Sequence, residues 1–117
     1  MTTETKRAGA PTFIALEVAL EMIRSLRRVV VLIRRSNCTV ADQIEDSASS
    51  VAANLAEGNR RRGKDRVQFF LIAAGSADET RAHLRVALAW GWVRDQDIGG
   101  SLALLDRELA LLWRLTH

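Results

Sequence analysis

Apolar residues recur at alternating steps of three and four along most of this chain, and this feature restricts the fold more than any other. Such spacing gives an α-helix one apolar face, whereas a half-buried strand needs alternation at every second residue. No segment shows a convincing strand pattern. The clearest apolar seam lies near the C-terminus and consists of Ile98, Leu102, Leu105, Leu109, Leu112 and Thr116. The sequence therefore predicts an all-α protein.

Four segments carry this pattern, and short polar connections separate them. We predict helices at about residues 11–35, 39–57, 64–90 and 97–116, after a flexible polar tail at residues 1–10. Because short connections make consecutive helices antiparallel neighbours, the expected architecture is an up-down-up-down four-helix bundle. A chain of 117 residues is the size of one such domain.

Each of the first three helices has its own predicted inward seam. Extra apolar residues widen the first seam, so that helix should contact more than one neighbour. The seams are Leu16, Ala19, Ile23, Leu26, Val30 and Ile33 in the first helix, Val40, Ile44, Ser47, Val51 and Leu55 in the second, and Val67, Phe70, Ala74, Ala77, Leu84 and Leu88 in the third.

Three glycines have predicted structural roles. Gly58 and Gly91 are expected to end helices, Gly58 in a left-handed conformation. Gly75 lies within the third helix, where glycine lowers stability, so we expect its bare backbone to pack closely against the second helix. That second helix is rich in serine and alanine at its centre, which would allow such an approach.

Composition excludes several classes of protein. A single cysteine, Cys38, leaves no intrachain disulfide and favours a reducing cytoplasm. The N-terminus lacks the apolar stretch of a signal peptide, and the longest apolar run, at residues 29–33, is too short to cross a membrane. We therefore expect a cytoplasmic protein without a membrane partner.

The segment from residue 43 to residue 93 carries a recognisable pair of motifs. The first motif runs from Gln43-Ile44 to Asn54-Leu55-Ala56-Glu57-Gly58, and Arg61 follows it. The second, at residues 68–79, reads QFFLIAAGSADE and includes Gly75, Ser76 and Glu79. With residues 13–19 and 88–93, these motifs make the chain similar to the four helix bundle protein family. That family includes proteins encoded in intervening sequences of bacterial large-subunit rRNA genes and the accessory variability determinant of diversity-generating retroelements.

The resemblance implies a four-helix bundle, a homopentamer and a non-enzymatic role linked to nucleic acid. It also implies, in its sharpest form, an accessory factor that binds a reverse transcriptase and its RNA or DNA. Two departures bear on partners rather than on the fold. Glu45-Asp46 stands where the family has a basic pair, and Ala52-Ala53 stands where it has Pro-Ser.

Positive charge is concentrated in the connection between the second and third helices. The chain has 17 Lys and Arg against 14 Asp and Glu, and this connection holds Arg60, Arg61, Arg62, Lys64 and Arg66. Such a cluster can bind several phosphates, and because no aromatic residue accompanies it, contact should be with the nucleic-acid backbone. The alternative is a solvated turn. A symmetric oligomer would join these turns into a positive rim.

A second group of arginines lies along the first helix, at Arg24, Arg27, Arg28, Arg34 and Arg35. This stripe is either a solvated helix face or a surface for phosphates. In an oligomer it can also pair with acidic residues of the second helix, namely Asp42, Glu45 and Asp46.

Other conspicuous side chains have predominantly structural interpretations. Asn54 is expected to fix helix register, and Glu57 needs a basic partner from the Arg60–Arg62 turn because it opposes the helix dipole. Trp90, Trp92 and Trp113 either close the core or anchor a subunit interface.

No constellation for catalysis or for a cofactor is apparent. Glu79 and His83 lie one helical turn apart, but a metal site in a bundle needs more carboxylates and histidines than this pair supplies. No nucleotide-binding or nucleophile motif is present. We therefore expect no enzyme activity, no metal and no cofactor. The leading hypothesis is an oligomeric nucleic-acid-binding scaffold, and the alternative is a protein–protein interaction module without a nucleic-acid role.

Overall fold

Four long helices make up the part of the chain that the computed structural model describes, residues 13–117. They are α2 (Ile14–Arg34), α3 (Cys38–Asn59), α4 (Gly63–Trp90) and α5 (Asp95–Thr116). The predicted tail at residues 1–10 and the predicted helix start at residue 11 lie outside this range. None of the described helices has a stretch long and apolar enough to cross a membrane.

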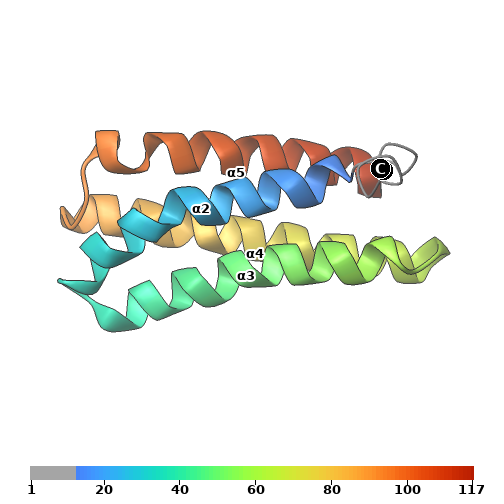
Figure 1. The fold of residues 1–117 in the computed structure, drawn as a ribbon, viewed down its shortest axis with the longest axis horizontal. Helices are drawn as coiled ribbons and strands as arrows, with labels where there is room; N and C mark the ends of the chain where they lie inside the picture. Colours follow the sequence, from blue (N-terminus) through green and yellow to red (C-terminus); the bar gives the residue numbers. More distant parts are fainter. Residues whose placement is uncertain (1–12) are drawn as a thin grey trace, which may run out of the picture.

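The helices form an antiparallel four-helix bundle, as the sequence predicted. Helix α2 packs against α3 and α5, and α4 packs against the same two helices, so α2 and α4 lie diagonally across the bundle. The α3–α4 hairpin extends beyond the start of α2 and the end of α5 (Figure 1). The turn that holds residues 60–62 therefore lies at one tip of the molecule.

Local signals at the helix ends explain where the chain turns. The Asn37 side chain accepts a hydrogen bond from the Val40 N–H at 2.9 Å and caps α3. Gly91 ends α4, as predicted, and it does so in the left-handed conformation with φ of 79°. Helix α5 begins at Asp95, two residues earlier than predicted, because the Asp97 carboxylate accepts a hydrogen bond from the Arg94 N–H.

The core confirms most predicted inward positions but corrects the seams of α4 and α5. Residues such as Ile44, Val51 and Leu84 are fully buried. In α4, however, Ala73, Thr80 and Ala87 are buried, whereas the predicted Val67, Ala74 and Leu88 are only half-buried. In α5, Ser101 and Glu108 are buried beside Ile98, Leu105 and Leu112, whereas the predicted Leu102, Leu109 and Thr116 are only half-buried. The buried face of α5 is turned from the predicted one by about 40°, less than half of the roughly 100° between successive residues, because α2 and α4 are packed on either side of the helix.

Hydroxyl pairs join neighbouring helices inside the bundle. Ser47 and Thr80 lie 2.7 Å apart between α3 and α4, and both are buried. A second bond of 2.8 Å, between Ser50 and Ser76, joins the same two helices. On the other side, Ser25 of α2 lies 2.8 Å from Ser101 of α5. These pairs satisfy groups that would be costly to bury alone, and they fix the register of the helices.

Two predicted glycine roles are wrong. Gly58 does not end α3, which continues to Asn59, and it lies buried against Phe70. A β-carbon at Gly58 would lie 2.7 Å from Phe70 Cε1, so the position needs glycine for close packing and not for its dihedral angles. Gly75 faces outward, and a β-carbon there would meet no atom within 4 Å. Its neighbour Ser76 is the residue that contacts α3.

Candidate nucleic-acid interface

One arginine of the basic turn between α3 and α4, Arg61, forms ion pairs within the turn. Arg61 bridges two carboxylates, with Nη2 at 2.8 Å from Glu57 and Nη1 at 2.8 Å from Asp65. Its guanidinium also lies 5.1 Å from the centre of the Phe69 ring. These contacts raise the pKa of Arg61, mainly through the hydrogen bond to Glu57 and then the one to Asp65. Arg61 is therefore the basic partner expected for Glu57.

Arg66 is also engaged, whereas the rest of the turn is exposed. Its Nη1 donates to the carbonyl oxygens of Gly58 and Asn59, and its guanidinium lies 4.8 Å from the centre of the Phe70 ring. Arg60, Arg62 and Lys64 are exposed and form no ion pair with any residue of the described range 13–117. Three of the five predicted cations of the turn are thus available for an anionic partner.

On α2, Arg34 is held by two carboxylates in the N-terminal half of α3. Its Nη1 lies 2.7 Å from Asp42 and its Nη2 lies 3.0 Å from Glu45. The hydrogen bond to Asp42 is the main cause of the raised pKa of Arg34. The pairing predicted between subunits thus forms for Arg34 within a single chain.

The other arginines of α2 point into solvent. Arg24, Arg27, Arg28 and Arg35 are all exposed, and none forms an ion pair within residues 13–117. The first three lie in α2 and Arg35 directly follows its last residue, so the four extend over 11 residue steps, a length of about 16 Å. We call these four residues the α2 arginine face. It lies on the C-terminal half of α2, and the basic turn lies at the opposite end of the bundle (Figure 1).

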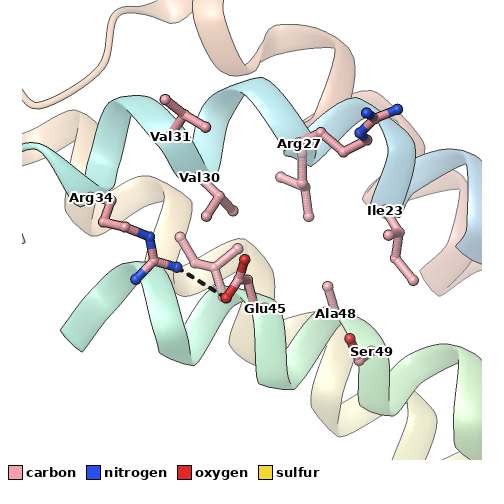
Figure 2. Close-up of a pocket in the computed structure, with 10 residues that line it drawn as sticks. Ile23, Arg27, Val30, Val31, Arg34, Glu45, Ala48 and Ser49 are labelled. Carbon is pink, nitrogen blue, oxygen red and sulfur yellow. Dashed lines mark hydrogen bonds and ion pairs between the residues drawn. The ribbon is translucent and has the colours of Figure 1, made fainter. Parts of the chain in front are cut away.

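A groove runs beside this face, between α2 and α3. It has a volume of about 600 Å³, and its walls combine apolar side chains such as Ile23, Val30 and Ala48 with charged ones at the rim. Figure 2 shows Arg34 reaching across to Glu45 in the groove, while the Arg27 guanidinium points away from that pair. Arg27 therefore belongs to the exposed surface.

The motif residues of α3 and α4 have structural positions. Asn54 is half-buried, and its Nδ2 donates to the Ser50 carbonyl at 2.9 Å and lies 3.0 Å from Ser50 Oγ. Ser50 in turn bonds Ser76, so Asn54 supports the α3–α4 contact indirectly. Glu79 is exposed and its carboxylate lies 3.3 Å from Nε2 of His83. Within residues 13–117, no three His, Cys, Asp or Glu residues lie together in a way that could hold a metal ion.

One unusual side chain was missed by the sequence analysis. Glu108 is fully buried in α5, and neither of its carboxylate oxygens has a hydrogen-bond partner among the described residues. Burial raises the pKa of Glu108 to about 8, although the nearby charge of Arg107 opposes the shift. Its spacing in the sequence could have indicated an inward position, because Glu108 lies three residues after Leu105 and four before Leu112. It was missed because a charged residue is not expected in an apolar seam.

The fold and the surface define a class of protein. It is a four-helix bundle whose exposed cations lie on the α2 arginine face and in the basic turn between α3 and α4. The chain belongs to the family described as 23S rRNA-intervening sequence protein, whose model matches residues 14–113. Its fold is similar to the crystal structure of a protein with unknown function from the S23 ribosomal protein family of Bacteroides thetaiotaomicron. The two share 18% sequence identity with a TM-score of 0.78 over 87% of this chain and 97% of the other. No curated protein matches the chain.

Proposed function

We propose that this chain is a cytoplasmic, non-enzymatic scaffold that self-associates and binds the phosphate backbone of RNA or DNA. The observation that carries the proposal is the α2 arginine face, in which four exposed arginines have no acidic partner within residues 13–117. Exposed guanidinium groups that form no ion pair remain available to an anionic ligand, and the guanidinium fork matches the oxygens of a phosphate.

The chemistry of this face favours phosphate over bases. No aromatic residue lies between positions 24 and 35, so the face offers no platform on which a base could stack. A length of about 16 Å is enough to contact several consecutive phosphates. We therefore expect binding that tolerates any sequence and weakens steeply with salt.

The basic turn has a secondary role in this proposal. Arg60, Arg62 and Lys64 add positive charge at the other end of the bundle, whereas Arg61 and Arg66 are committed to contacts within the chain. A long nucleic acid can contact both ends, and a short one is expected to bind the α2 arginine face first.

The family supports a link to RNA, because its description refers to intervening sequences of 23S rRNA. Two narrower roles are compatible with the same surface: a protein of an rRNA intervening sequence, and an accessory factor for a reverse transcriptase. The gene neighbourhood distinguishes them, since the first predicts an adjacent rRNA gene and the second an adjacent reverse transcriptase with a variable repeat.

Binding of labelled single-stranded RNA and duplex DNA, measured between about 50 and 200 mM salt, tests the proposal. If all four arginines contact phosphates of a duplex, affinity should fall roughly 100-fold over this range. Arg24→Ala/Arg28→Ala should weaken binding by about 30-fold at the lower salt, at about 1 kcal/mol for each lost contact. The matched control is Arg107→Ala/Arg114→Ala, which removes two exposed arginines of α5 and should change affinity by less than about 2-fold.

Equal losses in both double variants would show that only net charge matters and would contradict a specific role for α2. Absence of wild-type binding at the lower salt would refute the nucleic-acid role. It would favour the alternative function, a protein–protein interaction module. The observation that supports this alternative is the set of exposed apolar side chains on α4, which includes Leu71, Val86 and Trp90.

A further inference from the structure

The aromatic platform that the α2 arginine face lacks is present where α4 ends. Trp90, the last residue of α4, is 70% exposed, more than any other large apolar residue of the described range 13–117. Its ring is stacked on the ring of Trp92, with centres 6.1 Å apart and planes 11° apart. Trp92 is half-buried and packs against the hydrophobic core. The Trp90 ring is therefore held in a fixed orientation by the fold, while most of it remains in water.

A cation lies close to this tryptophan pair along the chain. Arg94 follows Trp90 by four residues, so their α-carbons are at most about 14 Å apart. The Arg94 side chain is 72% exposed. It lines a hollow of about 450 Å³ between α2 and the start of α5, and Arg28 of the α2 arginine face lines the same hollow. The other polar residues of the hollow are Ser25, Gln96 and Asp97.

The one carboxylate in this hollow is engaged in holding the start of α5. Asp97 accepts a hydrogen bond from the Arg94 N–H at 2.8 Å and lies 3.5 Å from Arg94 Nε. Arg28 forms no ion pair within residues 13–117. Two guanidinium groups against one carboxylate leave the hollow with an excess of positive charge, contributed from two different helices.

The tryptophan pair and the α2 arginine face lie at the same end of the bundle. Helices α2 and α4 both end there, and α3 and α5 begin there (Figure 1). The basic turn at residues 60–62 lies at the opposite end. A flexible strand of a few nucleotides that follows the α2 arginine face toward the end of α2 thus approaches both Arg94 and the exposed ring.

We propose that Trp90, supported by Trp92, is a base-stacking platform, and that with Arg28 and Arg94 it makes single-stranded nucleic acid the substrate of this end of the bundle. A base of the strand stacks on the exposed Trp90 ring, and neighbouring phosphates contact the two arginines. Stacking of this kind accepts any base, because every base has a π-face. The inference rests on the proposed phosphate binding by α2 and specifies its substrate class.

This substrate class differs from what charge alone would select. A duplex has the denser array of phosphates, so binding by arginines alone should favour it over a single strand. Its bases are already stacked on one another and reach an outside ring only after costly unstacking. A single strand has bases free to stack on Trp90. Preference for the single strand is therefore the property that distinguishes stacking from charge.

The first test compares a labelled single-stranded RNA of about 12 nucleotides with the duplex of the same sequence, at about 50 mM salt. The wild type should bind the single strand several-fold more tightly. Trp90→Ala should weaken single-strand binding about 10-fold, the loss of one stacked base, and change duplex binding less than about 2-fold. The matched control is Trp113→Ala, which removes a ring that is 61% exposed and stacked on His117 near the C-terminus. It should change neither affinity.

A backbone without bases separates stacking from phosphate contact. An oligodeoxynucleotide with abasic internal positions keeps its phosphates but offers no ring to Trp90. The wild type should bind it about 10-fold more weakly than an oligothymidylate of equal length, and Trp90→Ala should bind the two equally. Trp90→Phe keeps an aromatic ring and should recover most of the preference. Because the abasic comparison uses the wild type, it decides the question even where a variant unfolds.

The outcomes separate this inference from the proposed function. Absence of binding to every nucleic acid would refute both. Equal wild-type affinity for abasic and thymidine strands, tighter binding to the duplex, or an unchanged affinity in Trp90→Ala would overturn the platform and leave phosphate binding by α2 standing. Light scattering and circular dichroism check that Trp90→Ala keeps the mass and helix content of the wild type. A lower mass would assign the Trp90 ring to a contact between chains and would also overturn the platform.

Discussion

The basic turn and the α2 arginine face are both rich in arginine, but their arginines differ in how many contacts they form within the chain. In the turn, Arg61 is held between Glu57 and Asp65, and Arg66 is held by backbone carbonyls and the Phe70 ring. On α2, four arginines have no such partners within residues 13–117. The denser cluster in the sequence is thus the less available one in space. The number of basic residues in a short stretch of sequence therefore does not show how many of them are free to contact a ligand.

Glu108 is the extreme case in this comparison, because its carboxylate is fully buried and has no hydrogen-bond partner within residues 13–117. Its pKa is raised to about 8 in the folded chain, whereas an unfolded glutamate has its ordinary value near 4.5. Below about pH 4.5, Glu108 is protonated in both the folded and the unfolded chain, so folding buries no charge at this position. As the pH rises from about 4.5 to about 8, the carboxyl ionises only in the unfolded chain, and the free energy of unfolding should fall. The total loss is roughly 4 to 5 kcal/mol.

Glu108→Gln should remove this pH dependence. The variant and the wild type should melt at similar temperatures near pH 4.5, and the variant should melt more than about 10 °C higher near pH 8. Thermal melts by circular dichroism at both values measure the effect. Equal pH profiles for the two proteins would show that the Glu108 carboxyl reaches water or a cation in solution.

Gly58→Ala should disturb the base of the turn. The new methyl group would lie 2.7 Å from Phe70 Cε1, and Phe70 is fully buried and has little room to move. The free energy of unfolding should fall by about 1 to 2 kcal/mol, in spite of the better helix propensity of alanine. Chemical denaturation measures it. Gly100→Ala is the control, because its β-carbon meets no atom within 4 Å, and it should be neutral or slightly stabilising.

The smallest expected effect tests the comparison directly. Glu57→Gln/Asp65→Asn removes both carboxylates that hold Arg61, so the turn should become more available to phosphate. Affinity for duplex DNA should rise about 5-fold at low salt, and the salt dependence should steepen by about one ion. Asp42→Asn/Glu45→Gln provides the corresponding release of Arg34 on α2. A rise after only the second change would mean that the turn takes no part in binding.

The sequence predicted the fold because heptad spacing and short connections leave few alternatives to an antiparallel bundle. It also predicted the partner of Glu57, since Arg61 lies four residues further along. It did not predict the rotation of α5. Leu102 and Leu109 made an apolar seam more convincing than Ser101 and Glu108, and only packing against α2 and α4 decides which residues turn inward.

The same limit applies to the candidate site. Gly58 and Gly75 were interpreted from typical roles of glycine, whereas their surroundings depend on which side of each helix faces a neighbour. The availability of each arginine likewise depends on acidic residues brought close by the turns. Asp42 and Glu45 lie across the α2–α3 connection from Arg34, and the sequence alone did not show that they engage only that arginine.

The hydroxyl pairs are distributed unevenly among the helix contacts. Serine and threonine pairs join α3 to α4 and α2 to α5, whereas the ion pairs within residues 13–117 that join α2 to α3 and α4 to α5 lie at the surface. Helices α3 and α4 share two of the three hydroxyl pairs and also the most extensive packing in the bundle. Surface ion pairs contribute less than buried hydrogen bonds. Partial unfolding should therefore open the α3–α4 hairpin last, so that its amides exchange with solvent more slowly than those of α2 and α5.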